Sequence, residues 1–177
     1  MAGGSYYGYK IRGLQTQEDV KAIGLIRSQA WREAYEGIVS EEALDIRTPE
    51  YCAKRAEKLL TSEAQTFLAM DTGGRIVGFI ICGACRDEDK KNAGEICALY
   101  TLRETYGKGV GHDLMKAAQS HLDSLGYECE TILWVLEHNS RARAFYAKEG
   151  FSADGASKQL PDLGEGVIEI RMARQNF

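Results

Sequence analysis

The segment GEICALYTL, residues 94–102, opens the part of the chain that decides its fold. This apolar run has the composition of a buried strand, and the glycine-rich segment YGKGVG, residues 106–111, follows it. Beyond the glycines, apolar residues recur at helical spacing, and Gly126 stands where a helix would end. The helix face predicted to be buried carries Val110, Leu114, Ala118, Leu122 and Leu125. A second apolar run, residues 131–136, and the segment NSRARAFYAKEGF, residues 139–151, complete a strand–loop–helix–strand–helix pattern.

The rest of the chain adds helices before this region and strands on both sides of it. Thr16 is a good N-cap, with Asp19 three residues later, for a helix that Gly37 ends. Shorter helices are predicted from Ser40 and from Pro49. The predicted strands outside the central region are residues 9–14, 66–70, 75–85, 152–157 and 167–172. Helices interleaved with strands in this order predict an α/β (α+β) fold with a mixed sheet and helices on both faces.

The composition is that of an ordinary globular chain. At 177 residues, one domain covering residues 1–177 is expected. The 22 basic and 26 acidic residues give a net charge of −4, which argues against a nucleic-acid binder that depends on phosphate neutralisation. No apolar run reaches the ~18 residues that a membrane helix needs, and the segment MAGGSYY, residues 1–7, lacks the apolar core of a signal peptide. We therefore expect a cytoplasmic protein that binds neither nucleic acid nor membrane.

The cysteines and histidines do not form a metal or disulfide pattern. Cys82 and Cys85 have the C-x-x-C spacing, but they fall within one predicted strand, where residues three apart face opposite sides. No second pair is present for zinc, and five cysteines in a chain of this size do not make a disulfide scaffold. The three histidines without metal-ligand spacing are His112, His121 and His138. We expect buried apolar thiols and no metal.

The glycines of residues 107–111 lie between a predicted strand and a predicted helix. A helix N-terminus has free backbone N–H groups and a partial positive charge, and glycine lets a ligand approach the backbone closely. The pattern therefore suits a phosphate, although a tight strand-to-helix turn uses the same glycines. A Walker A loop is excluded because Gly109 follows Lys108, and a dinucleotide fingerprint is excluded because His112 stands at its third glycine. A phosphate-bearing ligand of another kind remains.

The last helix of the central region carries a second set of polar residues. Asn139 is a good N-cap, and Gly150 follows the predicted C-terminus. Tyr146 falls in the middle of this helix, where a tyrosine is either a core residue or a catalyst. The motif LYT (99–101) with GKGVG (107–111), and the motif N-x2-A-x2-FY-x3-GF (139–151), together resemble the GCN5-related N-acetyltransferases, the GNAT family.

The resemblance implies the GNAT acyl-CoA N-acyltransferase fold, a mixed sheet of about seven strands with helices on both faces. It also implies an enzyme that transfers acetyl from acetyl-CoA, its cosubstrate, directly to a primary amine in a ternary complex. In the family the pantetheine arm pairs with backbone that maps to Leu99, Tyr100 and Thr101. The pyrophosphate lies on backbone that maps to Gly107, Lys108, Gly109, Val110, Gly111 and His112. Asn139 and Tyr146 map near the thioester, where Tyr146 would protonate a departing thiolate whose pKa of about 8.5 requires only modest assistance.

The amine must be neutral to attack a thioester, which requires a base. Glu95 lies where the histone-acetylating branch of the family keeps its glutamate, near the start of the fourth strand; a strand-end surface carboxylate is the alternative. The ribosomal-protein branch keeps a glutamate on the fifth strand, but this chain has Trp134 there, which argues against that branch. Tyr106 occupies a loop position where the family usually has Gln or Arg.

The acceptor is predicted from the first helix and its end. The segment WREAYEGI, residues 31–38, resembles the small-molecule and polyamine branch, which implies a small amine or polyamine bound at Trp31 and Tyr35. Glu33 and Glu36 are candidates for attracting a cationic substrate. A protein N-terminus or lysine is the alternative acceptor, and a non-catalytic acyl-CoA sensor is the alternative function. The resemblance also implies that the protein could form a homodimer, since dimers are common in the family.

Two further regions of the sequence bear on the site without a motif of their own. The charged loop of residues 86–92 is expected to be a solvated surface without function. Acceptor selectivity is expected to lie in the helices of residues 31–60 and in the loop of residues 160–166.

Overall fold

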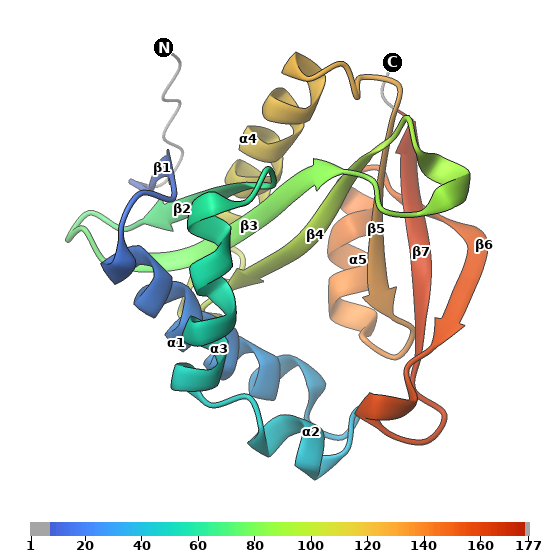
Figure 1. The fold of residues 1–177 in the computed structure, drawn as a ribbon, viewed down its shortest axis with the longest axis horizontal. Helices are drawn as coiled ribbons and strands as arrows, with labels where there is room; N and C mark the ends of the chain where they lie inside the picture. The colour runs from blue at the N-terminus through green and yellow to red at the C-terminus, as the bar shows by residue number, and fades with distance from the viewer. Residues whose placement is uncertain (1–7, 176–177) are drawn as a thin grey trace.

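The computed structural model describes residues 8–175, so the segment 1–7, for which the sequence predicts no signal core, lies outside the described residues. The strands form one seven-stranded sheet in the order β1-β2-β3-β4-β5-β7-β6 (Figure 1). The strands are β1 (Lys10–Gly13), β2 (Gln65–Met70), β3 (Ile76–Ala84), β4 (Gly94–Thr101), β5 (Glu130–Leu136), β6 (Ser152–Gln159) and β7 (Ile168–Gln175). Neighbouring strands in this sheet are antiparallel except β4 and β5, which are parallel. The predicted mixed sheet and the predicted order of its elements are confirmed.

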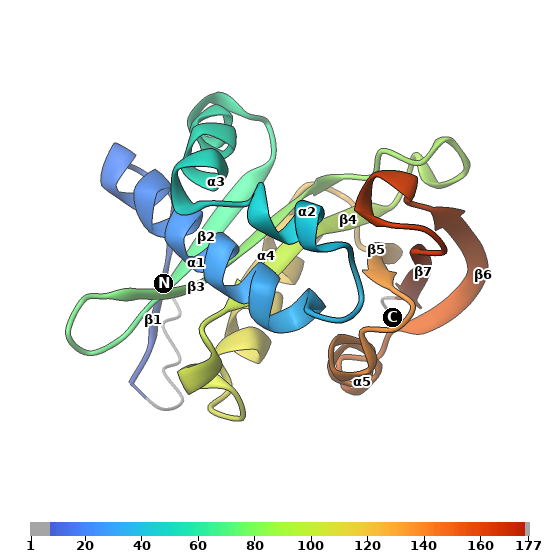
Figure 2. The same cartoon turned by 90° about the horizontal axis from the view of Figure 1, so that it is seen from below.

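Helices cover both faces of this sheet, as predicted. They are α1 (Gln17–Tyr35), α2 (Glu41–Asp45), α3 (Pro49–Ala56), α4 (Val110–Ser124) and α5 (Ser140–Lys148). The Arg27 guanidinium of α1 lies 5.6 Å from the ring centre of Phe79 on β3, whereas the neighbouring Gly78 faces Leu114 of α4. Because consecutive strand residues point to opposite faces, α1 and α4 lie on opposite sides of the sheet. Figure 2 shows α3 and α5 on opposite sides as well.

The start of α1 has the capping side chains that the sequence predicts, whereas the end of α4 differs from the prediction. The Thr16 side chain accepts a hydrogen bond from the Asp19 N–H, and the Asp19 side chain accepts one from the Thr16 N–H. Asp19 also pairs with Arg12 of β1, which holds the pKa of this carboxyl well below its usual range and attaches α1 to the first strand. Leu125, expected to be buried, is 53% exposed, because α4 ends before it and the chain turns at Gly126, whose φ is 88°.

Strands β4 and β5 pair over only three positions and then separate. The pairs are Gly94↔Thr131, Glu95↔Ile132 and Ile96↔Leu133. Strand β4 continues to Thr101 and β5 to Leu136, and Figure 1 shows the two strands diverging. Within residues 8–175, no strand pairs with this edge of β4 beyond Ile96. Backbone N–H and C=O groups on the two strand ends therefore remain available to a ligand.

A β-bulge in β4 changes which of its side chains share a face. The register of β4 against β3 skips Cys97, which is therefore the extra residue of the bulge. Tyr100 lies opposite Phe79, and Glu95 lies opposite Gly83. Because Phe79 and Gly83 are four residues apart on β3, they face the same side of the sheet. Tyr100 and Glu95 consequently share that face, although an unbulged strand would point them to opposite sides.

A second, smaller cluster of buried apolar residues lies at the C-terminal end of α1. Its members are Val39, Ala43, Leu44, Leu136 and Val167. Trp31 and Tyr35 pack against it from α1, and Leu160 and Leu163 pack against it from the loop before β7. The cluster thus joins the two regions that the sequence predicts to select the acceptor.

The structure also places the C-x-x-C cysteines. Cys82 is buried in β3, and burial raises the pKa of its thiol to about 12, as expected of an inert thiol. Cys85, also expected to be buried, is only partly buried because β3 ends at Ala84, one residue before it. Among the described residues, no group of His, Cys, Asp and Glu is placed to hold a metal ion. No helix of residues 8–175 has the length and apolar character needed to cross a membrane.

The crossing of α1 and α3 at Gly24 supplies a test of this packing. A Cβ atom at Gly24 would lie 2.6 Å from the Ala53 Cβ and 2.7 Å from both the Ala53 N and the Pro49 O. Alanine normally stabilises a helix by about 1 kcal/mol relative to glycine, but here the added methyl group must displace backbone. We expect Gly24→Ala to lower the free energy of unfolding by about 1–3 kcal/mol, measured by thermal unfolding with circular dichroism.

The exposed Gln29 on the same helix provides the control. Gln29→Ala is expected to change stability by no more than about 0.5 kcal/mol. A Gly24→Ala protein at least as stable as the wild type would contradict the prediction.

Candidate active site

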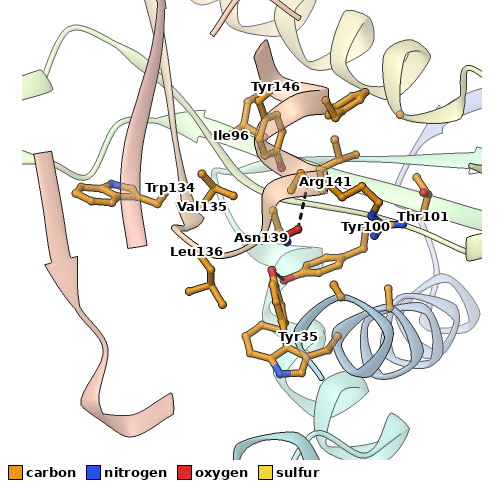
Figure 3. Close-up of a pocket in the computed structure, with 18 of the residues that line it drawn as sticks. Tyr35, Ile96, Tyr100, Thr101, Trp134, Val135, Leu136, Asn139, Arg141 and Tyr146 are labelled. Atoms are coloured by element: carbon orange, nitrogen blue, oxygen red, sulfur yellow. Dashed lines mark hydrogen bonds between the residues drawn. The ribbon is translucent and has the colours of Figure 1, made fainter. Parts of the chain in front are cut away.

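A cavity of about 770 Å³ opens where β4 and β5 separate (Figure 3). Its walls come from the diverging ends of β4 and β5, the N-terminus of α4 and one side of α5. The C-terminal half of α1 and the loop that carries Leu160 and Leu163 close the remaining side. Segments far apart in the sequence thus share one site of the size that small-molecule and cofactor sites have.

One end of the cavity is formed by the glycine loop and the first turn of α4. Gly107 and Gly109 have φ of 72° and 83°, a left-handed backbone that favours glycine. Helix geometry leaves the N–H groups of Val110, Gly111 and His112 without partners inside α4. These N–H groups and the dipole of α4 make this end an anion site.

Helix α5 adds positive charge beside that anion site. A Cβ atom at Gly111 would lie 3.2 Å from Phe145 Cζ, so glycine lets α4 and α5 approach each other closely. The Arg141 guanidinium of α5 lies 3.9 Å from the ring centre of Tyr106. Lys148 lines the same part of the cavity. Tyr106, which departs from the family pattern, therefore contacts a cation of the site through its ring.

Tyr146 and Asn139 bring α5 into the middle of the cavity. Tyr146 packs in the main core with 9% exposure and also lines the cavity. Burial raises the pKa of its hydroxyl, so the group is protonated at neutral pH. The Asn139 side chain accepts a hydrogen bond from the Ala142 N–H at 3.1 Å, the dashed line in Figure 3, which confirms the predicted N-cap.

Two tyrosines meet on the other side of the cavity. The Tyr35 hydroxyl of α1 lies 3.3 Å from the Tyr100 hydroxyl of β4, and Figure 3 shows the two pointing toward one another. Burial raises the pKa of both hydroxyls, so they act as neutral hydrogen-bonding groups. Trp31 packs against Tyr35 edge to face, with ring centres 4.6 Å apart.

Glu95 lines the cavity and is buried, with 2% exposure. Its Oε2 accepts hydrogen bonds from the Arg86 backbone N–H at 3.1 Å and from Arg86 Nε at 3.0 Å, while its Oε1 pairs with Arg86 Nη2. The same contact raises the pKa of Arg86. The interpretation of Glu95 as a surface carboxylate is therefore wrong. A carboxylate has about four acceptor positions, so one of them is not used by Arg86.

The loop of residues 86–92 is not merely a solvated surface, contrary to the prediction. Arg171 of β7, whose side chain is 7% exposed, pairs with Asp87 and Asp89 of this loop and with Asp154 of β6. Asp87 also accepts a hydrogen bond from Trp134 Nε1 at 3.0 Å. These contacts tie the loop to the sheet and hold in place the arginine that binds the site carboxylate.

The cavity gathers nearly all the residues that the sequence selects. Those that line it are Trp31, Tyr35, Glu95, Leu99, Tyr100, Thr101, Gly107, Gly109, Val110, Gly111, His112, Asn139 and Tyr146. Lys108 differs, because it is exposed and its backbone N–H donates to the Thr105 carbonyl. Glu33 and Glu36, expected to attract a cation, are exposed and do not line the cavity.

Five Lys and Arg residues of the cavity are not among the site residues that the sequence predicts. They are Arg27, Arg86, Arg141, Lys148 and Lys158. Arg27 is four residues before Trp31 and eight before Tyr35, so helical spacing alone places it on their face. Arg86 directly follows one predicted strand, and Glu95 lies at the start of the next. This placement of opposite charges at neighbouring strand ends is a second signal in the sequence. Arg141, Lys148 and Lys158 have no comparable signal in the sequence.

The arrangement suits transfer of a group between two bound molecules. The anion site and the cations of α5 can hold a phosphate-bearing carrier, and the free edge of β4 can hydrogen-bond an extended arm. Beside that edge lie a buried hydroxyl that can donate a proton and a carboxylate that can accept one. The aromatic end of the cavity leaves room for the second molecule.

Comparisons with known proteins agree with this geometry. The model of the "Acetyltransferase (GNAT) family" matches residues 22–151. YuaI of Bacillus subtilis (strain 168), an uncharacterised N-acetyltransferase, is 28% identical over 86% of this chain and 90% of its own length. The spermine/spermidine N(1)-acetyltransferase of the same organism is 37% identical over 54% of this chain and 62% of its own length.

A solved structure shows the same fold. The crystal structure of PaiA N-acetyltransferase from Thermoplasma acidophilum, in complex with coenzyme A, matches with a TM-score of 0.74 at 22% identity. The match covers 95% of this chain and 99% of that one. The predicted acyl-CoA N-acyltransferase fold is confirmed.

Removing Arg171 tests the attachment of the 86–92 loop. We expect Arg171→Met to lower the Tm by several degrees at pH 7, because three carboxylates lose a buried cation. Pairing with Arg171 lowers the pKa of Asp89 below its usual 3.8. That stabilisation is present above the usual pKa and is lost as the pH falls through the lowered pKa of the folded protein, so the difference in Tm between variant and wild type should persist down to about pH 4 and shrink below it.

An exposed ion pair gives the matched control for this experiment. Lys21→Met removes the surface pair with Glu18 and is expected to leave the Tm nearly unchanged. An Arg171→Met protein with the wild-type Tm at pH 7 would contradict the structural role of this cluster.

Proposed function

Because the chain belongs to the GNAT family of acetyltransferases, we propose that this N-acetyltransferase moves the acetyl group of acetyl-CoA to a small primary amine, with both substrates bound at once. The observation that carries the proposal is the cavity at the β4–β5 divergence. It has an anion site at one end and an aromatic pocket at the other, with a proton donor and a proton acceptor between them.

The residues present fit acetyl-CoA, which would supply an activated acetyl group on a thioester. The N–H groups of Val110, Gly111 and His112 suit its pyrophosphate, and the nearby Arg141 and Lys148 add positive charge. The free edge of β4, residues 99–101, suits the amide groups of the pantetheine arm. The similar fold of a protein solved with coenzyme A supports this assignment.

Tyr146 is proposed as the general acid. As the amine nitrogen bonds to the acetyl carbon, the C–S bond breaks and the electron pair goes to sulfur, a leaving group whose thiol has a pKa of about 8.5. Since burial raises the pKa of Tyr146, its hydroxyl carries a proton across the neutral range. It can donate a hydrogen bond, and then that proton, to the sulfur as negative charge develops.

Glu95 is proposed as the base, acting directly or through a water molecule. A primary ammonium with a pKa of about 10 has no lone pair for attack, so one proton must leave it first. Arg86 orients the Glu95 carboxylate and leaves one acceptor position for that proton.

A small acceptor is proposed because apolar and aromatic side chains form the walls of the cavity at the end opposite the anion site. Trp31 and Tyr35 form one wall, and Leu160 and Leu163 pack against the same cluster. The relative named a spermine/spermidine acetyltransferase makes polyamines one class to test. Peptides with a free N-terminus or lysine represent the alternative, a protein acceptor.

Replacing Tyr146 tests the general acid. We expect Tyr146→Phe to keep the affinity for acetyl-CoA and to lose roughly 10²-fold in kcat, measured as thiol release across a panel of amines. Because the pKa of Tyr146 is raised, ionisation of this residue should cause no loss of wild-type kcat up to about pH 10.

Tyr51 on α3 offers a matched tyrosine outside the cavity. Tyr51→Phe should leave kcat unchanged. A Tyr146→Phe enzyme within about twofold of the wild-type kcat would remove Tyr146 from the acid role.

Replacing Glu95 tests the base through its pH dependence. We expect Glu95→Gln to reduce kcat/KM near pH 7 and to recover activity as the pH rises toward about 10, because a deprotonated amine needs no base. Glu130→Gln, which breaks an ion pair with Lys90 outside the cavity, is the control and should match the wild-type profile. Unchanged turnover of Glu95→Gln at neutral pH would exclude Glu95 as the base.

A further inference from the structure

We propose that the acceptor carries a carboxylate in addition to its reacting amine, and that the Arg27 guanidinium binds this carboxylate. The inference rests on the proposed function and narrows its acceptor from small amines in general to amino acids and related amino carboxylates. The inference separates amino carboxylates from polyamines, whose positive charges would be repelled by the positive charge of the cavity.

Arg27 lies in the acceptor half of the cavity. It shares a face of α1 with Trp31 and Tyr35, and all three reach Tyr100. The Arg27 guanidinium is 5.6 Å from the ring centre of Tyr100, the Trp31 ring is 6.4 Å from it, and the Tyr35 hydroxyl meets the Tyr100 hydroxyl. Tyr146, the proposed acid, lines the same cavity as these residues.

The Arg27 guanidinium has no partner anion in the protein. Within residues 8–175 it makes no hydrogen bond and no ion pair, and its Nε is buried without an acceptor. A guanidinium has five N–H donors, and an enclosed donor without an acceptor is unfavourable. An anion entering the cavity at this position would supply the missing acceptors.

Three aromatic rings of the cavity that could bind a substrate cation are already covered by cations of the chain. The Arg47 guanidinium lies 4.1 Å from the ring centre of Trp31, and Lys158 Nζ lies 3.8 Å from that of Trp134. Arg27 covers a third ring of the cavity. An incoming ammonium would therefore have to displace an internal cation to make the same contact.

The carboxylates that line the cavity are also already paired. Glu95 is bound by Arg86, and Glu169 pairs with Lys158 at 2.9 Å. Arg141 and Lys148 lie beside the anion site, and the other Lys and Arg residues of the lining are Arg27, Arg86 and Lys158, against these two carboxylates. The acceptor half is thus positive in a chain whose net charge is −4. A polyamine would meet like charge there, without an unpaired carboxylate to offset it.

An amino carboxylate matches the two ends of this half-cavity. Its amine would give a proton to Glu95, and its carboxylate would fit the planar fork of the Arg27 guanidinium, which binds carboxylates through two parallel hydrogen bonds. A phosphate monoester could use the same fork, so phosphorylated amines belong in the test as a competing source of the anion.

The test is a comparison of matched acceptors with the full chain and acetyl-CoA. Thiol release is measured for the common amino acids and for ω-amino carboxylates from glycine to aminohexanoate. Each ω-amino carboxylate is paired with the diamine and the monoamine of the same carbon number, and phosphoethanolamine and spermidine are included. We expect the best amino carboxylate to have a KM about tenfold or more below that of its diamine.

Variants of Arg27 then identify the group that makes this difference. Arg27→Met should raise the KM for amino carboxylates about tenfold or more, and leave the KM for monoamines and for acetyl-CoA unchanged. Arg27→Lys keeps the charge but loses the planar fork, so its KM for amino carboxylates should lie between those of the wild type and Arg27→Met. Arg32→Met, on the same helix but outside the cavity, is the matched control, and circular dichroism checks that each variant is folded.

The outcomes separate this inference from the function on which it rests. If none of the amines in the panel causes thiol release, the proposed function itself is overturned. Preference for diamines or spermidine over amino carboxylates would overturn the inference and leave the function standing, as would preference for phosphoethanolamine. An Arg27→Met variant that raises the KM of monoamines as much as that of amino carboxylates would show a structural role for Arg27 and would also overturn it.

Discussion

Hydrogen bonding between β4 and β5 ends at the Ile96–Leu133 pair, and the whole site depends on that ending. Where two strands of a sheet separate, their facing backbone groups lose their partners, so a ligand with amide groups can take the place of the missing strand. Because α4 follows β4 and α5 follows β5, the two helices begin near the separated ends of these strands. The divergence of the strands therefore creates the space for an anion at the start of α4, while the Gly111–Phe145 contact limits how far the two helices separate.

The bulge at Cys97 determines how the proposed base is placed in the cavity between β4 and β5. It brings Glu95 onto the face of the sheet that carries Tyr100 and α1, so the paired carboxylate and the aromatic pocket lie on one side. The charges around that pocket are mostly satisfied internally, with the buried Arg171 holding the loop whose arginine binds Glu95. At the acceptor end, Arg27 makes neither a hydrogen bond nor an ion pair within residues 8–175, and for that reason it gives the pocket a preference of its own.

Much of the fold and most of the candidate site could be predicted from local patterns. The Thr16 and Asn139 caps and the left-handed glycines around α4 act on backbone within a few residues, and each lies where the sequence predicts it. The errors have physical causes of another kind. Helical spacing continued through Leu125 although α4 ends before it. The sequence predicted a solvated 86–92 loop because Arg171, which pairs with this loop, is more than 80 residues away in the chain.

The sequence by itself determined the order of the elements, the capped starts of α1 and α5 and the anion-binding loop, because caps, helical periodicity and glycine backbone are local properties. Only the tertiary structure decided where β4 and β5 stop pairing, which face Glu95 points to, and which cations are already paired. These features depend on contacts between distant segments, and a one-residue change of register, such as the bulge at Cys97, reverses the face of every side chain beyond it. The phosphate-binding end of the site is thus determined by one short segment of the sequence, whereas the acceptor end forms only when the whole sheet has folded.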